Sequence, residues 1–239
     1  PEVLKFFMSI GVPLFEAYGM TENCAYATSN SPENIKIGTV GIPAHGVELK
    51  LADDGEILIR SGGVFKGYFK DDQATSETID KDGWLHTGDV GIYEGHFVKI
   101  IDRKRDIIIT SGGKNVSPSE IENKIKVSPF IKEAIVIGDR RKFLSVLIGI
   151  EFDTVSNWAL RKNIPHTTYR DLSEKQEVKD LVWKEISRAN ELTSSLEVRE
   201  FRMIPKELDH EEGELTATQK VKRNVLIDQF SDLIEEMYS

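Results

Sequence analysis

A single lysine near the C-terminus is the first residue whose setting suggests chemistry. Lys220 lies in GELTATQKVKR, residues 213–223, between small polar residues and a basic pair. The residues before it have no apolar period, whereas VLIDQFSDLIEEMY after it is periodic, so Lys220 is predicted at a junction between a loop and a helix. Most lysines in such places are solvated surface charges, so the rest of the chain has to decide whether this one acts on a ligand.

Three further polar stretches, each joined to the end of a predicted strand, carry residues of related chemistry. They are YGMTE at 18–22, GWLHTGD at 83–89 and DRKRDIIITSGGKN at 102–115. Singly, each has a structural explanation: Tyr18 as a core residue, Asp89 as a turn former and the glycine pair at 112–113 as a hairpin corner. Together with Lys220 they supply an aromatic ring, carboxylates, arginines and a mobile cation, which can bind a nucleotide and Mg²⁺ without a P-loop.

The familiar motifs for nucleophilic, nucleotide and metal chemistry are absent from the sequence. It contains no G-x-S-x-G, no P-loop and no G-x-G-x-x-G. The histidines are isolated from one another and do not form a cluster with metal-ligand spacing. They are His45, His86, His96, His166 and His210. We interpret His86 as a sheet residue rather than a ligand.

The first part of the chain predicts a helix, a strand and a small antiparallel sheet. PEVLKFFMSIG has the period of an amphipathic helix, and VPLFEAYG at 12–19 predicts a buried strand that delivers the polar loop 20–34. From about Ile35 to Ile101, short strands turn at the Asp-Asp-Gly sequence 53–55 and at Glu94-Gly95. This pattern indicates a small antiparallel sheet or barrel.

The charged run at 102–106 marks the boundary between two predicted domains, 1–102 and 103–239. The second domain mixes strands and helices, so the fold class is α+β. Ser117, with Glu120 three residues later, is a capping-box signature for the first of these helices. Strands are predicted at 106–110, 132–139, 144–152 and 198–204, and helices at 117–127, 153–163, 174–192 and 225–238.

The last predicted helix carries an apolar stripe beside an acidic face. The stripe consists of Leu226, Phe230, Leu233, Ile234 and Met237. Because acidic residues flank it, an anionic lipid surface is disfavoured, and we predict that the stripe docks on its own domain.

Composition limits the class of protein. The balance of 31 Lys+Arg against 40 Asp+Glu gives a formal charge of -9, which argues against a nucleic-acid partner. One cysteine, Cys24, excludes an internal disulfide, and neither a membrane-spanning run nor a signal peptide is evident, so we expect a cytoplasmic protein. Because the chain opens on Pro1, we expect a piece of a longer protein, which leaves any peripheral membrane contact to its N-terminal part.

The four polar stretches, in this order, resemble the adenylate-forming superfamily of acyl-CoA synthetases, luciferases and peptide-synthetase adenylation domains. GEILIRSGGVFKGYFKD at 55–71 is similar to another segment of that family, and the opening helix resembles the one after its Gly-Gly-Ala adenine segment. TSGGKNVSPSEIE at 110–122 resembles the long-chain fatty acyl-CoA synthetases. The resemblance covers essentially the whole chain. It implies the end of a large N-terminal domain, followed by a small mobile C-terminal domain.

The resemblance also implies roles for residues of the first domain. Tyr18 would lie against adenine beside Gly19, Thr21 would contact the AMP phosphate, and Glu22 would ligate Mg²⁺. Thr21 and Glu22 thereby count among the catalytic groups. The family's ribose contacts would fall to two further residues, Asp89 and Arg103.

In the second domain the resemblance implies a hinge, a coenzyme A contact and a catalytic lysine. Arg105 falls at the hinge, where Asp or Lys is more usual in the family. Gly112 and Gly113, with Lys114, would let the backbone approach the pantetheine tunnel. Lys220 would stabilise the charge that develops when a fatty carboxylate attacks the α-phosphorus of ATP. The domain would then rotate for thioester formation with coenzyme A.

Two alternatives to a long-chain fatty acid:CoA ligase stay open from the sequence. One is an adenylating enzyme with another acceptor, such as a carrier protein's phosphopantetheine or oxygen. The other is a non-catalytic module of the same fold, against which the joint presence of Glu22, Asp89, Arg103 and Lys220 argues. The family's phosphate loop and most of its acyl pocket would precede Pro1, so we expect this chain alone to be inactive.

Overall fold

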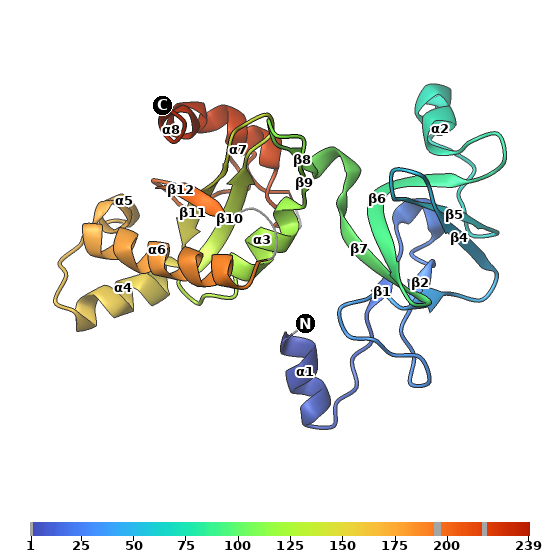
Figure 1. Cartoon of the computed structure of the whole chain (residues 1–239), viewed down its shortest axis with the longest axis horizontal. Coiled ribbons are helices and arrows are strands. Elements are labelled where there is room, and N and C mark those ends of the chain that lie inside the picture. The colour runs from blue at the N-terminus through green and yellow to red at the C-terminus, as the bar shows by residue number, and fades with distance from the viewer. Residues whose placement is uncertain (1, 194–196, 217–218) are drawn as a thin grey trace. The chain divides into compact units, whose positions relative to one another are not determined.

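The structure is a computed structural model that describes residues 2–193, 197–216 and 219–239. The chain forms two compact units, Pro1–Asp106 (unit 1) and Ile107–Ser239 (unit 2) (Figure 1). Both units combine helices with mainly antiparallel sheets, so the predicted α+β fold class is confirmed.

The two units divide at the end of the charged run 102–106, whereas the sequence analysis placed the boundary between residues 102 and 103. The difference has a local cause. Strand β7 (Phe97–Arg103) continues through Arg103, and a 3-10 turn at Lys104–Asp106 follows it and packs beside β6 (Leu85–Glu94). These residues therefore extend unit 1 rather than opening unit 2.

Unit 1 is built on a four-stranded antiparallel sheet in the order β4-β5-β6-β7. Its first two strands are β4 (Val47–Leu51) and β5 (Glu56–Ser61). The two hairpins predicted at 53–55 and at Glu94-Gly95 are confirmed, because β4 pairs with β5 and Glu94 pairs with Phe97. Ile57 and Ile59 alternate along β5 toward one face and are fully buried there in the core of unit 1.

Short elements complete unit 1. They are α1 (Glu2–Ser9), the three-stranded antiparallel sheet of β1 (Ala17–Tyr18), β2 (Thr28–Ser29) and β3 (Ile42–Pro43), the 3-10 turn Thr21–Asn23, and α2 (Asp72–Thr78). Helix α2 was not predicted. It begins after Asp71, whose carboxylate accepts a hydrogen bond from the Ala74 amide at 2.9 Å, and it carries no apolar stripe that periodicity could detect.

The prediction of a buried strand at 12–19 was wrong for most of its length. Only Ala17–Tyr18 are in a strand, and Val12, Leu14 and Phe15 are between 37% and 44% exposed. No strand in the described ranges pairs with residues 12–15, and an extended segment without a neighbouring strand cannot satisfy its backbone in a ladder.

Unit 2 contains a three-stranded sheet with β11 in the middle. Its strands are β10 (Ile131–Ile137), β11 (Leu144–Ile150) and β12 (Val198–Met203), with β10 antiparallel and β12 parallel to β11. The helices are α3 (Pro118–Ile125), α4 (Phe152–Arg161), α5 (Tyr169–Glu174), α6 (Gln176–Glu191), α7 (Arg223–Gln229) and α8 (Ser231–Glu236). A two-stranded hairpin, β8 (Ile108–Ile109) and β9 (Asn115–Val116), precedes α3.

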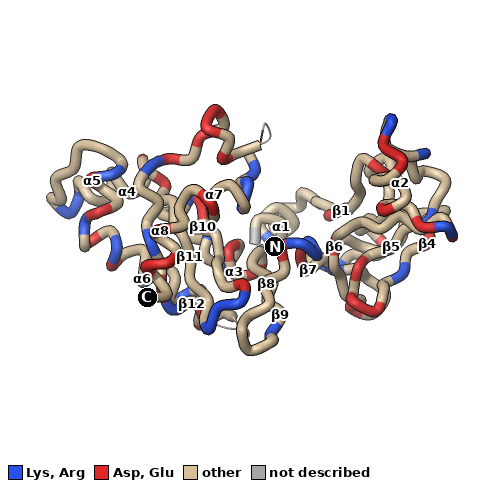
Figure 2. The backbone as a smooth tube through the Cα atoms, turned by 90° about the horizontal axis from the view of Figure 1, so that it is seen from above, with Lys and Arg blue, Asp and Glu red and all other residues tan. Residues whose placement is uncertain are grey.

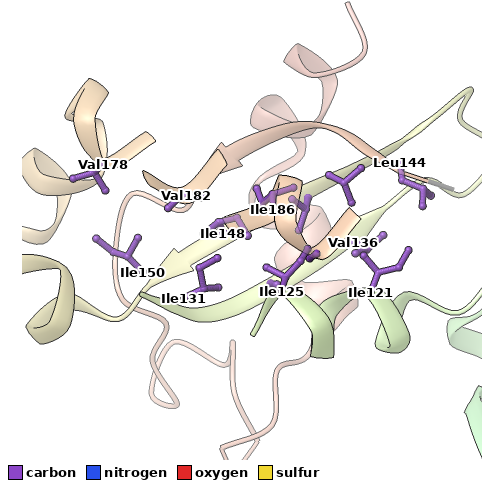
Figure 3. Close-up of a cluster of buried hydrophobic side chains, with 14 of the residues drawn as sticks. Ile121, Ile125, Ile131, Val136, Leu144, Ile148, Ile150, Val178, Val182 and Ile186 are labelled. Carbon is purple, nitrogen blue, oxygen red and sulfur yellow. The ribbon is translucent and has the colours of Figure 1, made fainter. Parts of the chain in front are cut away.

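Helices cover both faces of this sheet. Val136, Val146 and Ile148 pack against α3, α4, α5 and α6, and Figure 3 shows this cluster around Ile121, Ile125 and Ile186. Ile135, Ile137 and Leu147, which alternate with them, pack against α7 and α8. Figure 1 shows α7 and α8 on the opposite side of the strands from α3 and α6. The apolar runs IVI in β10 and VLI in β11 are therefore buried by helices on both faces of the sheet.

The first and last helices of unit 2 differ in how closely they follow the sequence pattern. The cap of α3 is confirmed, because Ser117 Oγ accepts a hydrogen bond from the Glu120 amide at 3.3 Å. The C-terminal helix is broken at Phe230 into α7 and α8, but Leu226, Phe230 and Ile234 are buried against the sheet as predicted. No helix among the described residues is long and apolar enough to cross a membrane.

Candidate functional site

An open cleft of about 680 Å³ lies in unit 1 at the ends of β1, β6 and β7. It is lined by Gly19, Met20, Thr21, Glu22, Thr87, Gly88, Arg103, Lys104 and Arg105. Three of the four polar stretches identified in the sequence thus contribute to one cleft, although they are far apart along the chain. Figure 2 shows basic and acidic residues mixed along the tube of unit 1, and the basic run at 103–105 starts at the last residue of β7.

The turn that carries Thr21 and Glu22 is fixed by a side-chain hydrogen bond within it and by close packing of its backbone. The Asn23 side chain is fully buried, and its Oδ1 accepts a hydrogen bond from the Met20 amide at 2.9 Å. Gly19 lies so close to Ala25 that a Cβ on Gly19 would stand 2.2 Å from the Ala25 carbonyl carbon. Gly19 is therefore required by chain packing, whatever it contributes to a ligand.

Tyr18 and Asp89 form a hydrogen-bonded pair beside Arg103. The Tyr18 hydroxyl donates to Asp89 Oδ2 at 2.5 Å, and Arg103 Nε lies 3.7 Å from Asp89 Oδ1. The Asp89 amide donates to Thr87 Oγ1 at 3.1 Å, which fixes the turn on which the carboxylate sits. Burial, and then the hydrogen bond to Asp89, raise the pKa of the Tyr18 hydroxyl, so it stays protonated and remains a donor.

The structure gives Tyr18 a role in the fold in addition to the predicted adenine contact. Its ring packs against the core of unit 1, and its hydroxyl is occupied by Asp89. Neither Tyr18 nor Asp89 lines the cleft, but each adjoins a residue that does, Gly19 and Gly88. The Asp89 side chain is 16% exposed, which leaves its carboxylate partly open to a ligand. The adenine and ribose assignments stay predictions.

Glu22 is held by a residue that the sequence analysis did not identify. The Tyr68 hydroxyl donates to Glu22 Oε1 at 2.8 Å, and this bond, followed by burial, raises the pKa of Tyr68. Tyr68 lies in the GVFKGYFKD segment, which the resemblance singled out as a segment but not by residue. Within the described ranges no three His, Cys, Asp or Glu side chains form a metal cluster. One carboxylate suits Mg²⁺, which keeps several waters and takes phosphate oxygens as ligands.

The basic run after β7 is held unevenly. Lys104 Nζ lies 2.6 Å from Asp54 Oδ2 and 3.0 Å from Glu56 Oε2, and hydrogen bonds to these carboxylates raise the pKa of Lys104. Arg105, the predicted hinge, has a side chain that is 76% exposed and lies 3.9 Å from Asp106. The last strong attachment of this segment to unit 1 is therefore at Lys104, one residue before the predicted hinge.

The glycine pair of unit 2 lies in the exposed turn between β8 and β9. The Gly113 amide donates to the Thr110 carbonyl at 2.9 Å, and Gly113 has a φ of +75°, which favours glycine. Gly112 is different, because a Cβ there would meet nothing closer than Thr110 Oγ1 at 4.0 Å. The fold thus explains Gly113 but not Gly112. Lys114 is exposed and forms no ion pair with any described residue.

Lys220 lies at the end of a turn just before α7, as predicted, and two residues of that turn, 217 and 218, lie outside the described ones. The Thr216 amide donates to the Lys220 carbonyl at 2.8 Å, and the Lys220 amide donates to Thr216 Oγ1 at 3.0 Å. Its side chain forms no ion pair with a described residue. By contrast, Arg223 pairs with Glu122 at 2.6 Å and donates to the Val136 carbonyl, so it anchors α7 on the sheet.

The structure brings the predicted residues of unit 1 together, whereas those of unit 2 lie on two different turns. In unit 1, Gly19, Thr21, Glu22, Arg103 and Arg105 line one cleft, and Tyr18 and Asp89 adjoin it. In unit 2, the 112–114 turn and the Lys220 turn are both exposed and both held by backbone hydrogen bonds. Sequence reasoning missed several residues with clear contacts, among them Asn23, Glu56, Tyr68 and Lys104.

Comparison with known families and proteins gives consistent matches. The AMP-binding enzyme family matches residues 1–69, and the AMP-binding enzyme C-terminal domain matches residues 105–239. A long-chain-fatty-acid–CoA ligase, FadD15 of Mycobacterium bovis, is 38% identical over 98% of this chain and 39% of its own length. Human long-chain-fatty-acid–CoA ligase 6 is 35% identical over 100% of this chain and 37% of its own. The chain thus spans about two fifths of these relatives.

Solved structures agree on the fold. The adenylation domain of a carboxylate reductase from Mycobacterium chelonae superposes with a TM-score of 0.78 at 24% identity, covering 100% of this chain and 37% of that one. O-succinylbenzoate coenzyme A synthetase from Bacillus subtilis, in complex with ATP and a magnesium ion, gives 0.67 at 27% identity, with 93% and 43% covered. The chain therefore belongs to the adenylate-forming superfamily of AMP-binding enzymes and is homologous over its whole length to long-chain fatty acid–CoA ligases.

Proposed function

We propose that the full-length gene product is an AMP-forming long-chain fatty acid:CoA ligase. It would activate a fatty acid with ATP and transfer the acyl group to coenzyme A. The observation that carries the proposal is the grouping of Tyr18, Asp89 and Arg103 beside the cleft that Thr21 and Glu22 line. The identity of 35–38% to long-chain ligases over nearly the whole chain supports the choice of substrate class.

The cleft residues would bind and orient the nucleotide in the first half-reaction. The Asp89 carboxylate, held by Tyr18, can accept hydrogen bonds from ribose hydroxyls, and Arg103 offers donors beside it. Thr21, exposed on its turn, can donate to a phosphate oxygen. Glu22 would hold Mg²⁺, which when bound neutralises phosphate charge. Because Tyr18 and Tyr68 hold the Asp89 and Glu22 carboxylates before substrate arrives, these two groups would be pre-organised for the reaction.

Lys220 would supply a positive charge in the same half-reaction. The carboxylate oxygen of the fatty acid forms a bond to the α-phosphorus of ATP, the bond to pyrophosphate breaks, and acyl-AMP results. Negative charge spreads over the phosphoryl oxygens as this happens. An ammonium group brought there stabilises the transition state more than the ground state. An exposed lysine on a turn, with no ion pair to a described residue, is free to serve in this way.

The turn at 112–114 would act in the second half-reaction. The coenzyme A sulfur attacks the acyl carbonyl carbon, AMP leaves, and the thioester forms. A glycine without a neighbour near its Cβ position allows close approach by a pantetheine chain, which fits Gly112. Rotation of unit 2 about the segment around Arg105 would exchange the two turns between the half-reactions.

Two assays on the full-length gene product test the proposal. Pyrophosphate exchange into ATP, measured with acids from acetate to a long-chain fatty acid, should be fastest with the long chain. Addition of free coenzyme A should then give acyl-CoA and AMP. Exchange with long-chain acids but no thioester with free coenzyme A would favour a carrier-protein acceptor. Absence of exchange with every acid would leave only the non-catalytic alternative.

A further inference from the structure

Glu56 is a buried carboxylate next to the cleft that neither the motifs nor the proposed chemistry use. It opens β5, is 5% exposed, and bonds to groups on β6 and on the segment after β7. We propose that Glu56 is a positioning residue that ties the turn of Asp89 to the start of the interunit segment at Lys104. This inference rests on the proposed function, since it assigns Glu56 to the same nucleotide site.

One oxygen of Glu56 holds the turn that carries the candidate ribose ligand. Glu56 Oε1 accepts a hydrogen bond from the Gly88 amide at 3.0 Å. Gly88 lines the cleft and directly precedes Asp89, whose own amide is bonded to Thr87. Gly88 has a φ of +70°, so this turn depends on a conformation that glycine adopts readily. The hydrogen bond that Gly88 donates to Glu56 fixes the position of that turn and thereby the direction of the Asp89 side chain.

The other oxygen holds the segment that leads to unit 2. Glu56 Oε2 lies 3.0 Å from Lys104 Nζ and 3.3 Å from His86 Nδ1. Lys104 is flanked by Arg103, which faces Asp89, and by the exposed Arg105. Anchoring Lys104 therefore keeps Arg103 in the cleft and lets any rotation begin only after residue 104. The same carboxylate group thus fixes a ligand-binding turn and the near side of a hinge.

The charge of Glu56 is maintained by its partners. Burial alone would raise the pKa of Glu56, but the hydrogen bonds from Lys104, Gly88 and His86 outweigh burial and lower it. Other charged groups around the cluster are Asp54, which also pairs with Lys104, and Asp80, which lies 3.7 Å from His86 Nε2. Glu56 is buried and contacts both the Gly88 amide and the Lys104 ammonium group. A substitution at Glu56 therefore tests the link between the Asp89 turn and the Lys104 segment better than a substitution at Asp54.

Three variants of the full-length gene product test this arrangement. In Glu56→Gln the amide oxygen can still accept from Gly88, but its NH₂ group faces Lys104 and His86, so only the segment should be released. Glu56→Ala removes both attachments. Glu48→Gln is the matched control, because Glu48 forms an exposed ion pair with Arg60 on the same sheet, away from the cleft. The measurements are hydrogen exchange of the amides at 104–107, the Kd for AMP, the rate of acyl-AMP formation and Tm.

The expected results differ between the two Glu56 variants. Glu56→Gln should speed exchange at 104–107 by about tenfold while changing the Kd for AMP by less than about threefold. Glu56→Ala should do the same to exchange, weaken AMP by about tenfold and slow acyl-AMP formation by about 10²-fold, because the Asp89 turn shifts. Glu48→Gln should change none of these.

Other results would overturn the inference. If both Glu56 variants lower Tm but match Glu48→Gln in exchange and in AMP affinity, Glu56 is only a structural residue of the sheet. If the wild-type protein forms no acyl-AMP with any acid, the proposed function fails. Exchange at 104–107 and AMP affinity then still decide whether Glu56 links the turn to the segment.

Discussion

The two units carry their candidate functional residues in opposite ways. In unit 1 these side chains are already bonded to one another: Tyr18 to Asp89, and Tyr68 to Glu22. In unit 2 the corresponding residues, on the 112–114 turn and at Lys220, are exposed and held only through their backbone. A bonded set of side chains suits a ligand that stays through both half-reactions, whereas free side chains on turns suit contacts that are made and released.

A buried glutamate of unit 2, Glu214, supports the turn that carries Lys220. Glu214 is fully buried, and its carboxylate accepts from the Asp209 amide at 2.8 Å and lies 2.7 Å from Lys206 Nζ. Its carbonyl accepts from the Lys222 amide, so this glutamate braces the base of the turn that presents Lys220. Each unit thus has a buried glutamate close to its candidate functional residues. Glu56 lies next to the cleft of unit 1, and Glu214 lies at the base of the Lys220 turn in unit 2.

The largest expected effect comes from removing the ammonium group of Lys220. In the full-length gene product, Lys220→Ala should slow acyl-AMP formation by about 10² to 10³-fold, the usual cost of losing one electrostatic contact to a transition state. Synthetic acyl-adenylate should still be converted to acyl-CoA at close to the wild-type rate. Lys222→Ala, two residues further along the chain, is the control and should affect neither step. An equal decrease in the rates of acyl-AMP formation and thioester formation would contradict the proposal that Lys220 acts in the first half-reaction alone.

The next effect concerns the bonded set in unit 1. Tyr18→Phe keeps the ring in the core but removes the hydroxyl that donates to Asp89. Since a hydrogen bond to a charged group contributes about 1.5–3 kcal/mol, AMP affinity measured by calorimetry should fall by about tenfold or more. Tyr93→Phe is a suitable control, because its hydroxyl donates to the Leu49 carbonyl elsewhere on the sheet. Unchanged AMP affinity in Tyr18→Phe would show that the pair serves the fold alone.

A smaller effect separates two glycines, one in each unit. Gly112→Ala should fold normally, because its Cβ meets open space, and should slow only thioester formation, by a few-fold to about tenfold. Gly19→Ala should instead lower stability by about 1–3 kcal/mol, because its Cβ would collide with the Ala25 backbone. Thermal unfolding and the two half-reactions measure both. A Gly112→Ala protein with normal thioester formation would remove the coenzyme A contact from this turn.

The mildest test leaves the sequence intact. Brief digestion with trypsin should cut after Arg105 before it cuts after Lys104 or within either sheet, because the Arg105 side chain is 76% exposed whereas Lys104 is paired with two carboxylates. N-terminal sequencing of the fragments identifies the bond. Earlier cleavage within either sheet would place the flexible point of the chain elsewhere.

Local patterns predicted much of this architecture, and long-range contacts were out of their reach. The hairpin at Glu94-Gly95 and the cap at Ser117 depend on residues close in sequence, and both are confirmed. The buried strand at 12–19 failed because apolar residues alone do not supply a neighbouring strand.

The same limit explains what the sequence could not reveal about the site. Glu56 and Lys104 are far apart along the chain, and in sequence Glu56 is only the first residue of a strand after a turn. Tyr68 lies in a segment without a clear period, so nothing local connects it with Glu22. Family resemblance indicated which residues to examine, and the fold shows which of them contact one another.

The parallel pairing of β11 with β12 has a consequence for biosynthesis. A parallel partner requires a crossover, and here α4, α5 and α6 intervene before β12 is translated. At roughly 5–20 residues per second, a ribosome needs on the order of several seconds to make that crossover. Throughout that interval β11 exposes an unpaired edge, which a nascent chain has to shield from other chains. The turn with Lys220 emerges later still, so the helices that follow it close the second face of the sheet last.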